Sequence, residues 1–159
     1  MSALLERLRA DARAADALHE RSRQLLVSAV RTGAAAGLSQ REIAAAIERS
    51  QPEVSRLLRF QGQSGLGRRL ARNRRRVLAT ARAYGARDVR VFGSVARGTD
   101  GPDSDIDLLV ELPEAVSLFT LARLERDLAE LLGAKVDVVP SGSLRSNLAD
   151  QVLSEAVPL

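Results

Sequence analysis

The segment from Val89 to Val110 constrains the fold of this chain most, because it reads as strand, glycine turn and acidic strand in succession. The apolar run Val89–Phe92 predicts a strand that ends in a tight turn at Gly93-Ser94. After a polar loop, residues 105–110 predict a second strand. A strand pair joined in this way predicts a small sheet with one face in a core.

Two carboxylates lie on the second predicted strand at alternate positions. Because strand side chains alternate, Asp105 and Asp107 share one face and leave the intervening apolar residues for the core. A third carboxylate, Asp137, lies on a predicted strand at residues 135–139, on the same face as Lys135. Neighbouring carboxylates repel each other, and an oxygen-seeking cation such as Mg²⁺ relieves that repulsion. Three such groups can hold two metal ions about 3.5–4 Å apart for an in-line displacement.

The turn at Gly93-Ser94 suits an anion. Glycine lets the backbone approach a ligand closely, and successive N–H groups in a turn can form an anion-binding nest. Arg97 follows three residues after Ser94 and offers a cation for phosphate, although pairing with Asp100 or Asp103 is the alternative.

Together these residues resemble the polymerase-beta-like nucleotidyltransferase superfamily, and in particular its small bacterial branch, the minimal nucleotidyltransferases. The resemblance spans residues 86–159 and rests on Gly93-Ser94, Arg97-Gly98, Ser104-Asp105, Asp107 and Asp137. It implies an α+β fold in which a short mixed sheet is flanked by helices. It also implies transfer of a nucleotidyl group from ATP or another NTP to a hydroxyl, with release of pyrophosphate.

The resemblance assigns a role to each matching residue. It implies that the nucleotide is bound by Gly93, Ser94, Arg97 and Ser104. It implies that two Mg²⁺ ions are held by Asp105, Asp107 and Asp137. Asp137 is also the base implied for the attacking hydroxyl.

Small enzymes of this branch often act as antitoxins, encoded beside a HEPN-type ribonuclease toxin to which they add adenylyl groups. The resemblance therefore implies a cognate toxin as the acceptor of AMP or another NMP. Two alternatives stay open: a transcription regulator that senses nucleotide without catalysis, and an enzyme that modifies a small molecule.

Charge divides the chain into unlike halves. Residues 1–86 carry 17 arginines against 7 acidic residues, a net charge of +10, whereas residues 87–159 carry 7 basic against 13 acidic residues, a net charge of −6. A basic surface favours nucleic acid through release of counterions.

The basic half contains two capped helices in close succession. Ser39 and Glu42 form a capping box before an apolar helix face, and Ser50 with Glu53 opens a second helix after a short break. This pair resembles a bacterial helix-turn-helix, whose second helix enters the DNA major groove. The candidates for contact with operator DNA are Gln51, Ser55, Arg56 and Arg59. One departure is that the turn often carries glycine where this chain has Glu48 or Arg49.

The remaining pattern completes a two-domain prediction. Residues 1–62 are expected to form a helix-turn-helix domain, residues 63–85 a linker and connecting helix, and residues 86–159 the nucleotidyltransferase domain. Within them we expect helices at 3–32, 68–84, 114–132 and 143–155, with Leu118 and Leu148 facing inward on the last two. The first of these has a leucine-rich stripe, for which packing on the helix-turn-helix is favoured over a homodimer contact. Glu155, at the end of the last helix, is expected to be a surface charge.

The composition agrees with an intracellular protein. The chain has no cysteine, so it has neither a disulfide framework nor a zinc-thiolate site. No apolar run approaches the length of a membrane span, and no signal peptide is recognisable. The sequence therefore predicts a cytoplasmic location without membrane attachment.

Overall fold

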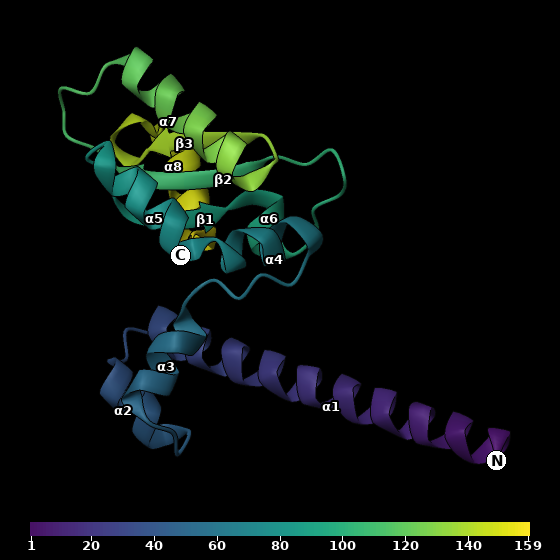
Figure 1. Cartoon of the computed structure of the whole chain (residues 1–159). Helices are drawn as coiled ribbons and strands as arrows, with labels where there is room; N and C mark the ends of the chain where they lie inside the picture. The colour runs from purple at the N-terminus through teal and green to yellow at the C-terminus, as the bar shows by residue number, and fades with distance from the viewer. The chain divides into compact units, whose positions relative to one another are not determined.

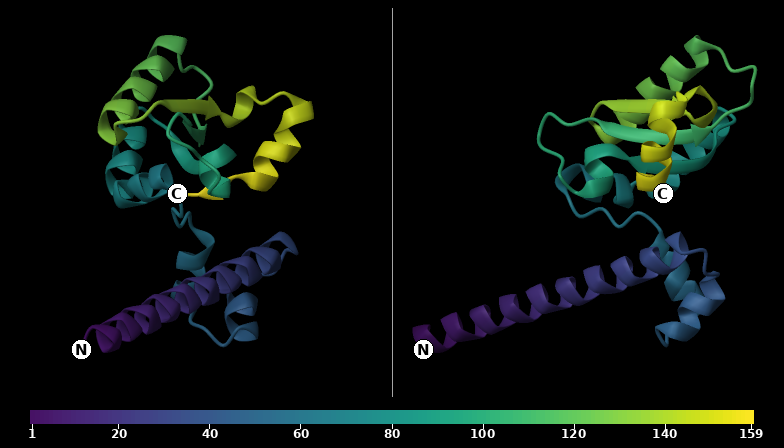
Figure 2. Two further views of the ribbon diagram at one scale, coloured as in Figure 1. Left: turned by 90° about the vertical axis from the view of Figure 1, so that its right-hand side faces the viewer. Right: turned by 180° about the vertical axis from the view of Figure 1, so that it is seen from behind.

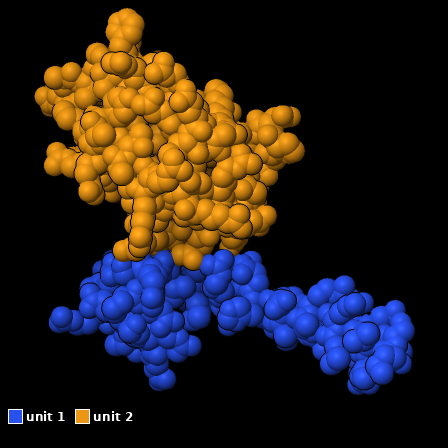
Figure 3. All heavy atoms as spheres, in the orientation of Figure 1, with its two compact units in different colours: residues 1–58 blue, residues 59–159 orange.

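The computed structural model describes all 159 residues, which divide into two compact units, residues 1–58 and 59–159 (Figure 3). The first unit is entirely helical and the second combines helices with a sheet. None of the helices has both the length and the apolar character that crossing a bilayer requires.

The first unit contains three helices, α1 (Ser2–Ala35), α2 (Gln40–Ala46) and α3 (Gln51–Leu58). The predicted capping box is confirmed, since the Ser39 hydroxyl accepts from the Glu42 N–H while the Glu42 carboxylate accepts from the Ser39 N–H at 2.8 Å. Glu48, in the turn between α2 and α3, has a φ of 54°, the left-handed conformation that glycine adopts more easily.

Only the C-terminal part of α1 packs on the two short helices, and the rest of it extends well beyond them (Figures 1 and 2). Val30 joins Ile43, Ala44 and Val54 in a small core. The prediction that the leucine stripe makes this contact is wrong. Helical residues two apart lie on nearly opposite sides, so burying Val27 turns Leu25 towards solvent. The exposed members of that stripe are Leu4, Leu8, Leu18 and Leu25.

The second unit is built on a four-stranded sheet in the order β3-β2-β1-β4. Strands β1 and β2 are antiparallel, β2 and β3 are parallel, and β1 and β4 are antiparallel. The mixed sheet and the first three strands agree with the predicted α+β class. The strands are β1 (Arg87–Phe92), β2 (Ile106–Glu111), β3 (Val136–Pro140) and β4 (Val157–Pro158). The helices are α4 (Gly65–Arg72), α5 (Arg74–Ala83), α6 (Gly93–Arg97), α7 (Leu118–Leu132), the 3₁₀ turn η1 (Ser141–Ser143) and α8 (Ser146–Glu155).

One face of the sheet forms the main core. Ile106 and Leu108 of β2 are fully buried there with Val91 of β1, as strand alternation predicts. Helices α5 and α7 pack against this face, where Val77 of α5 and Leu128 of α7 are fully buried. The opposite face at the start of β2 is thereby left for polar side chains.

Several helix boundaries and two buried positions differ from the sequence prediction. The helix expected at 68–84 is two helices that meet at Asn73, and α4 begins at Gly65, inside the segment expected to be a linker. The Ser64 hydroxyl accepts from the Gly67 N–H and thereby starts α4 early. Helix α7 begins at Leu118, which is 84% exposed although it was expected to face inward. Leu148 of α8 is likewise exposed rather than buried.

Candidate active site

The three carboxylates named from the sequence gather at one end of the sheet. Asp107 of β2 is the direct partner of Asp137 in the parallel pair of β2 and β3, so their side chains lie on the same face. Asp105 immediately precedes β2 on that face. All three are partly accessible to solvent, which a site for a soluble substrate requires.

Asp107 carries the clearest electrostatic signature of this group. Its burial, and then the negative charges of Asp137 and Asp105, raise the pKa of the Asp107 carboxyl above its usual value. Lys135 and Arg97 oppose this shift, but the net direction remains upward. A half-buried carboxylate beside two others has a strong preference for a bound cation.

A lysine ammonium supplies part of the positive charge that these carboxylates favour. The Nζ atom of Lys135 lies 2.8 Å from Asp105 Oδ2 and 3.7 Å from Asp137 Oδ1, and Asp105 is the main cause of the raised pKa of Lys135. No three acidic, histidine or cysteine side chains are arranged to hold a metal ion. The donor chemistry nevertheless fits Mg²⁺, because carboxylate oxygens from adjacent strands already hold a cation between them.

The turn that follows β1 is a short helix, α6, and it lies directly against this cluster. Gly93 has a φ of 72°, and a Cβ atom at this position would overlap the Asp107 carboxylate. Glycine is therefore required here both for its conformation and for its lack of a side chain. Ser94 is half-buried in α6, and its carbonyl accepts from the Thr99 N–H at 2.9 Å.

The N–H of Gly93 and the guanidinium of Arg97 converge on one carboxylate. Glu155 Oε1 accepts from the Gly93 N–H at 2.5 Å and from Arg97 Nη1 at 2.6 Å. Arg97 therefore pairs with neither Asp100 nor Asp103, the partners that the sequence left open as alternatives. The prediction that Glu155 is merely a surface charge is wrong, since its side chain is only 20% exposed.

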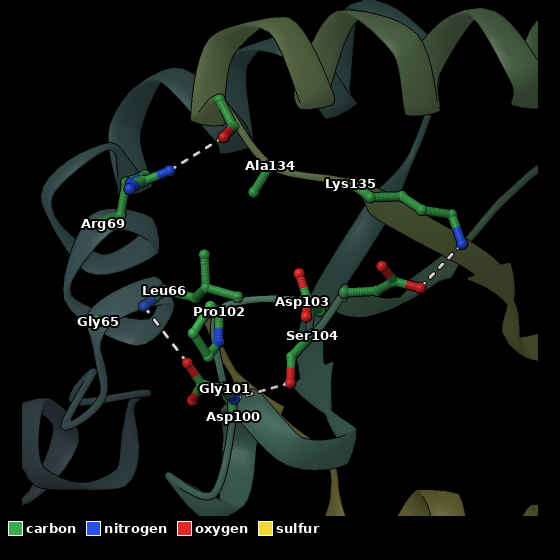
Figure 4. A pocket seen from close by; sticks show the side chains of 12 residues that line it. Gly65, Leu66, Arg69, Asp100, Gly101, Pro102, Asp103, Ser104, Ala134 and Lys135 are labelled. Carbon is green, nitrogen blue, oxygen red and sulfur yellow. Dashed lines mark hydrogen bonds and ion pairs between the residues drawn. The ribbon is translucent and has the colours of Figure 1, made fainter.

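The loop between α6 and β2 lines a cavity of about 730 Å³ beside Asp105 and Lys135 (Figure 4). Arg69 lies on the other side of the cavity and donates to the carbonyls of Leu132 and Gly133, the residues that end α7. Ser104, expected to contact nucleotide, accepts from the Gly101 N–H at 2.8 Å and so closes the loop. The cavity gives a ligand room beside Asp105, whereas Asp107 and Asp137 do not line it.

Sequence reasoning missed two residues of this site, Lys135 as the cation between carboxylates and Glu155 as the acceptor for the Gly93 N–H and Arg97. Lys135 had a usable signal, because it alternates with Asp137 on one strand. Glu155 had none, because it is brought to the site by a two-residue strand that no hydrophobic pattern could reveal.

The residues expected to contact DNA lie apart from this site in the sequence, on and after α3. Gln51 and Arg56 are exposed and Ser55 is half-buried, whereas Val54 between them is fully buried. Arg59 is exposed and follows α3 as the first residue of the second unit.

Comparison with known proteins identifies relatives of this chain. The profile of the nucleotidyltransferase domain family matches residues 75–159. The protein adenylyltransferase MntA of Thermococcus cleftensis is 46% identical over 74 residues, which cover 46% of this chain and 75% of that protein. A solved structure of a candidate minimal nucleotidyltransferase is 49% identical with a TM-score of 0.53, covering 57% of this chain and 92% of that one. A crystal structure of a toxin–antitoxin with AMP-PNP is 26% identical with a TM-score of 0.50, covering 54% and 71% of the two chains.

Proposed function

The chain belongs to the nucleotidyltransferase domain family and is a nucleotidyltransferase, and from this premise we propose that it is an Mg²⁺-dependent antitoxin that transfers AMP, or another NMP, to a hydroxyl of a cognate toxin. The observation that carries the proposal is the pairing of Asp107 with Asp137 across β2 and β3, beside the Gly93 turn. This pairing supports a site in which carboxylates bind metal while the nearby Gly93 N–H and Arg97 bind phosphate.

The proposed mechanism assigns a task to each of these groups. The Gly93 N–H and the Arg97 guanidinium bind phosphate oxygens, with Ser94 beside them on α6 and Ser104 shaping the adjoining loop. Asp137 accepts the proton of the acceptor hydroxyl while that oxygen bonds to the α-phosphorus and the bond to pyrophosphate breaks. Positioning the hydroxyl in line with the leaving group is the main contribution that such a site makes.

Asp105, Asp107 and Asp137 are the residues that would hold Mg²⁺. The raised pKa of Asp107 and the ammonium between Asp105 and Asp137 both support a cation site. When bound, Mg²⁺ neutralises charge on the phosphate oxygens and lowers the pKa of the attacking hydroxyl. Lys135, whose side chain is 68% exposed, would release Asp105 Oδ2 for that carboxylate to hold the ion.

A protein acceptor is supported by the relatives. One curated relative is named a protein adenylyltransferase, and one similar structure is a toxin–antitoxin with AMP-PNP. The family match at residues 75–159 lies in the second unit, where the carboxylates lie. We therefore propose a toxin of the HEPN type as the acceptor and ATP as the nucleotide.

The deciding experiment is label transfer from [α-³²P]ATP with Mg²⁺ to the product of the adjacent gene. We expect label on that protein with the wild-type chain and none with Asp105→Ala/Asp107→Ala. The matched control is Asp150→Asn, which removes an exposed charge from α8. Absence of label with all four nucleotides, together with tight DNA binding, would favour the nucleotide-sensing regulator. Label on a small molecule alone would favour the enzyme that modifies a small molecule.

We further propose that the first unit binds operator DNA and so regulates its own expression. The support is the capped pair α2 and α3, with Gln51, Ser55 and Arg56 on its polar side and Val54 in its core. In a mobility-shift assay with the upstream promoter, Arg56→Ala should weaken binding and lessen its salt dependence. The control Arg13→Ala removes an exposed arginine from α1 and should leave binding unchanged. Arg59 as a DNA contact and a homodimer of the chain stay predictions from the sequence.

A further inference from the structure

Strand β4 brings the end of the chain to the proposed nucleotide site. Val157 pairs with Val91 and Pro158 with Arg90 in an antiparallel register. The Leu159 N–H continues this register with a 3.0 Å hydrogen bond to the Val89 carbonyl. Followed in the other direction, the register sets Glu155 opposite Gly93, and its carboxylate accepts from the Gly93 N–H.

The carboxylate of Glu155 makes the contacts that a phosphate oxygen would make. One of its oxygens receives both the Gly93 N–H and Arg97 Nη1, at 2.5 and 2.6 Å. Both bonds are charge-assisted because the acceptor is a carboxylate, and such bonds are stronger than those between neutral groups. Arg97 is also one of the two cations that lower the pKa of Asp107, so its orientation matters to the carboxylate cluster.

We propose that Glu155 is a positioning residue that occupies the phosphate site as an internal anion and is exchanged for a phosphate oxygen when a nucleoside triphosphate binds. The inference rests on the proposed function, because it assumes that Gly93 and Arg97 bind phosphate. In the nucleotide-free enzyme, Glu155 keeps the amide and the guanidinium converging on one point. Nucleotide affinity is thereby set by competition between two anions.

Exchange is favoured over simultaneous binding for two reasons. A phosphate oxygen beside the Glu155 carboxylate would place two anions side by side at one N–H donor, which is repulsive. In addition, α8 has no fully buried residue and contacts α6 as its main neighbouring helix, so the last turn can move at small cost to the core. The pairing of β4 with β1 retains the chain end while Glu155 leaves.

The test is Glu155→Gln in the full chain, with Asp150→Asn as the matched control on the same helix. The amide keeps the size and an acceptor oxygen of the carboxylate but loses its charge, so nucleotide should displace it more easily. We expect the Kd of MgATP by calorimetry, and the KM for ATP, to fall about tenfold in Glu155→Gln while kcat changes little. Asp150→Asn should match the wild type, and thermal unfolding should confirm that both variants are folded.

The outcomes separate this inference from the proposed function. Suppose that the wild type binds and transfers nucleotide, but the Kd of MgATP is unchanged or raised in a folded Glu155→Gln variant. This result would overturn the exchange of Glu155 for phosphate, and Glu155 would then serve only to hold α8 against α6. A wild type that binds no nucleotide would overturn the proposed function and this inference with it. Inhibition by inorganic pyrophosphate gives a second readout, since it too should become about tenfold stronger without the glutamate charge.

Discussion

Replacing Gly93 by alanine adds a single methyl group at the point where the turn after β1 meets the carboxylate cluster. The residue has a φ of 72°, and a side chain of L configuration in this region costs about 1–2 kcal/mol. The new Cβ would also overlap Asp107 Oδ2, so the carboxylate or the turn must give way. Gly93→Ala thus combines a backbone penalty with a displaced candidate metal ligand.

Gly98 provides a matched control at the other end of the same short helix. It has the same φ of 72°, but a Cβ there would meet nothing closer than the Gln63 side chain at 3.6 Å, which is ordinary contact. Gly98→Ala should therefore lose about 1–2 kcal/mol of unfolding free energy without displacing a carboxylate. The difference in transfer rate between the two variants isolates the effect of the overlap with Asp107.

The assays are urea unfolding and transfer of label from [α-³²P]ATP to the partner protein. Both variants should lose similar stability, whereas Gly93→Ala should transfer label about 100-fold more slowly than Gly98→Ala, because a shift of about 1 Å in a reacting site can cost that much. Equal rates in the two variants would refute the reasoning, since the Asp107 carboxylate would then have no need of its present position.

Three further changes test the core, the cluster and the first unit. Leu128→Ala empties a fully buried position under the sheet and should cost about 2–5 kcal/mol in urea unfolding, whereas Leu118→Ala, at a site 84% exposed, should cost less than about 0.5 kcal/mol. Because the pKa of the Asp107 carboxyl is raised in the folded state, the folded chain binds the carboxyl proton more tightly than the unfolded chain does. Without Mg²⁺, the free energy of unfolding should therefore fall as pH rises from the unfolded-state pKa of Asp107 through its folded-state pKa. Asp107→Asn should remove this fall in thermal unfolding with EDTA while abolishing transfer; a variant less stable than wild type at neutral pH would contradict the argument. Ser39→Ala breaks the capping box and should cost about 1 kcal/mol, seen as faster hydrogen exchange in α2; unchanged exchange would show the cap to be dispensable.

The sequence alone was sufficient for features that depend on neighbours along the chain. Alternation on β2 correctly predicted that Ile106 and Leu108 face the core while Asp107 does not. The capping box at Ser39 and Glu42 could likewise be predicted from the sequence, because its two residues are three positions apart. The sequence predicted that Asp107 and Asp137 could share one site, but alternation within each strand does not decide that β2 and β3 are adjacent, as their pairing requires.

Only the tertiary structure decided the position of Glu155. Its contact with Gly93 spans 62 residues and depends on β4, a strand of two residues with no periodic pattern of its own. The break at Asn73 and the exposure of Leu118 were hidden for a related reason, since each depends on what packs against the helix rather than on its apolar spacing. Local patterns fix which face of an element is apolar, but the register between distant strands fixes which charges meet, and in this protein that register places an internal carboxylate at the proposed phosphate site.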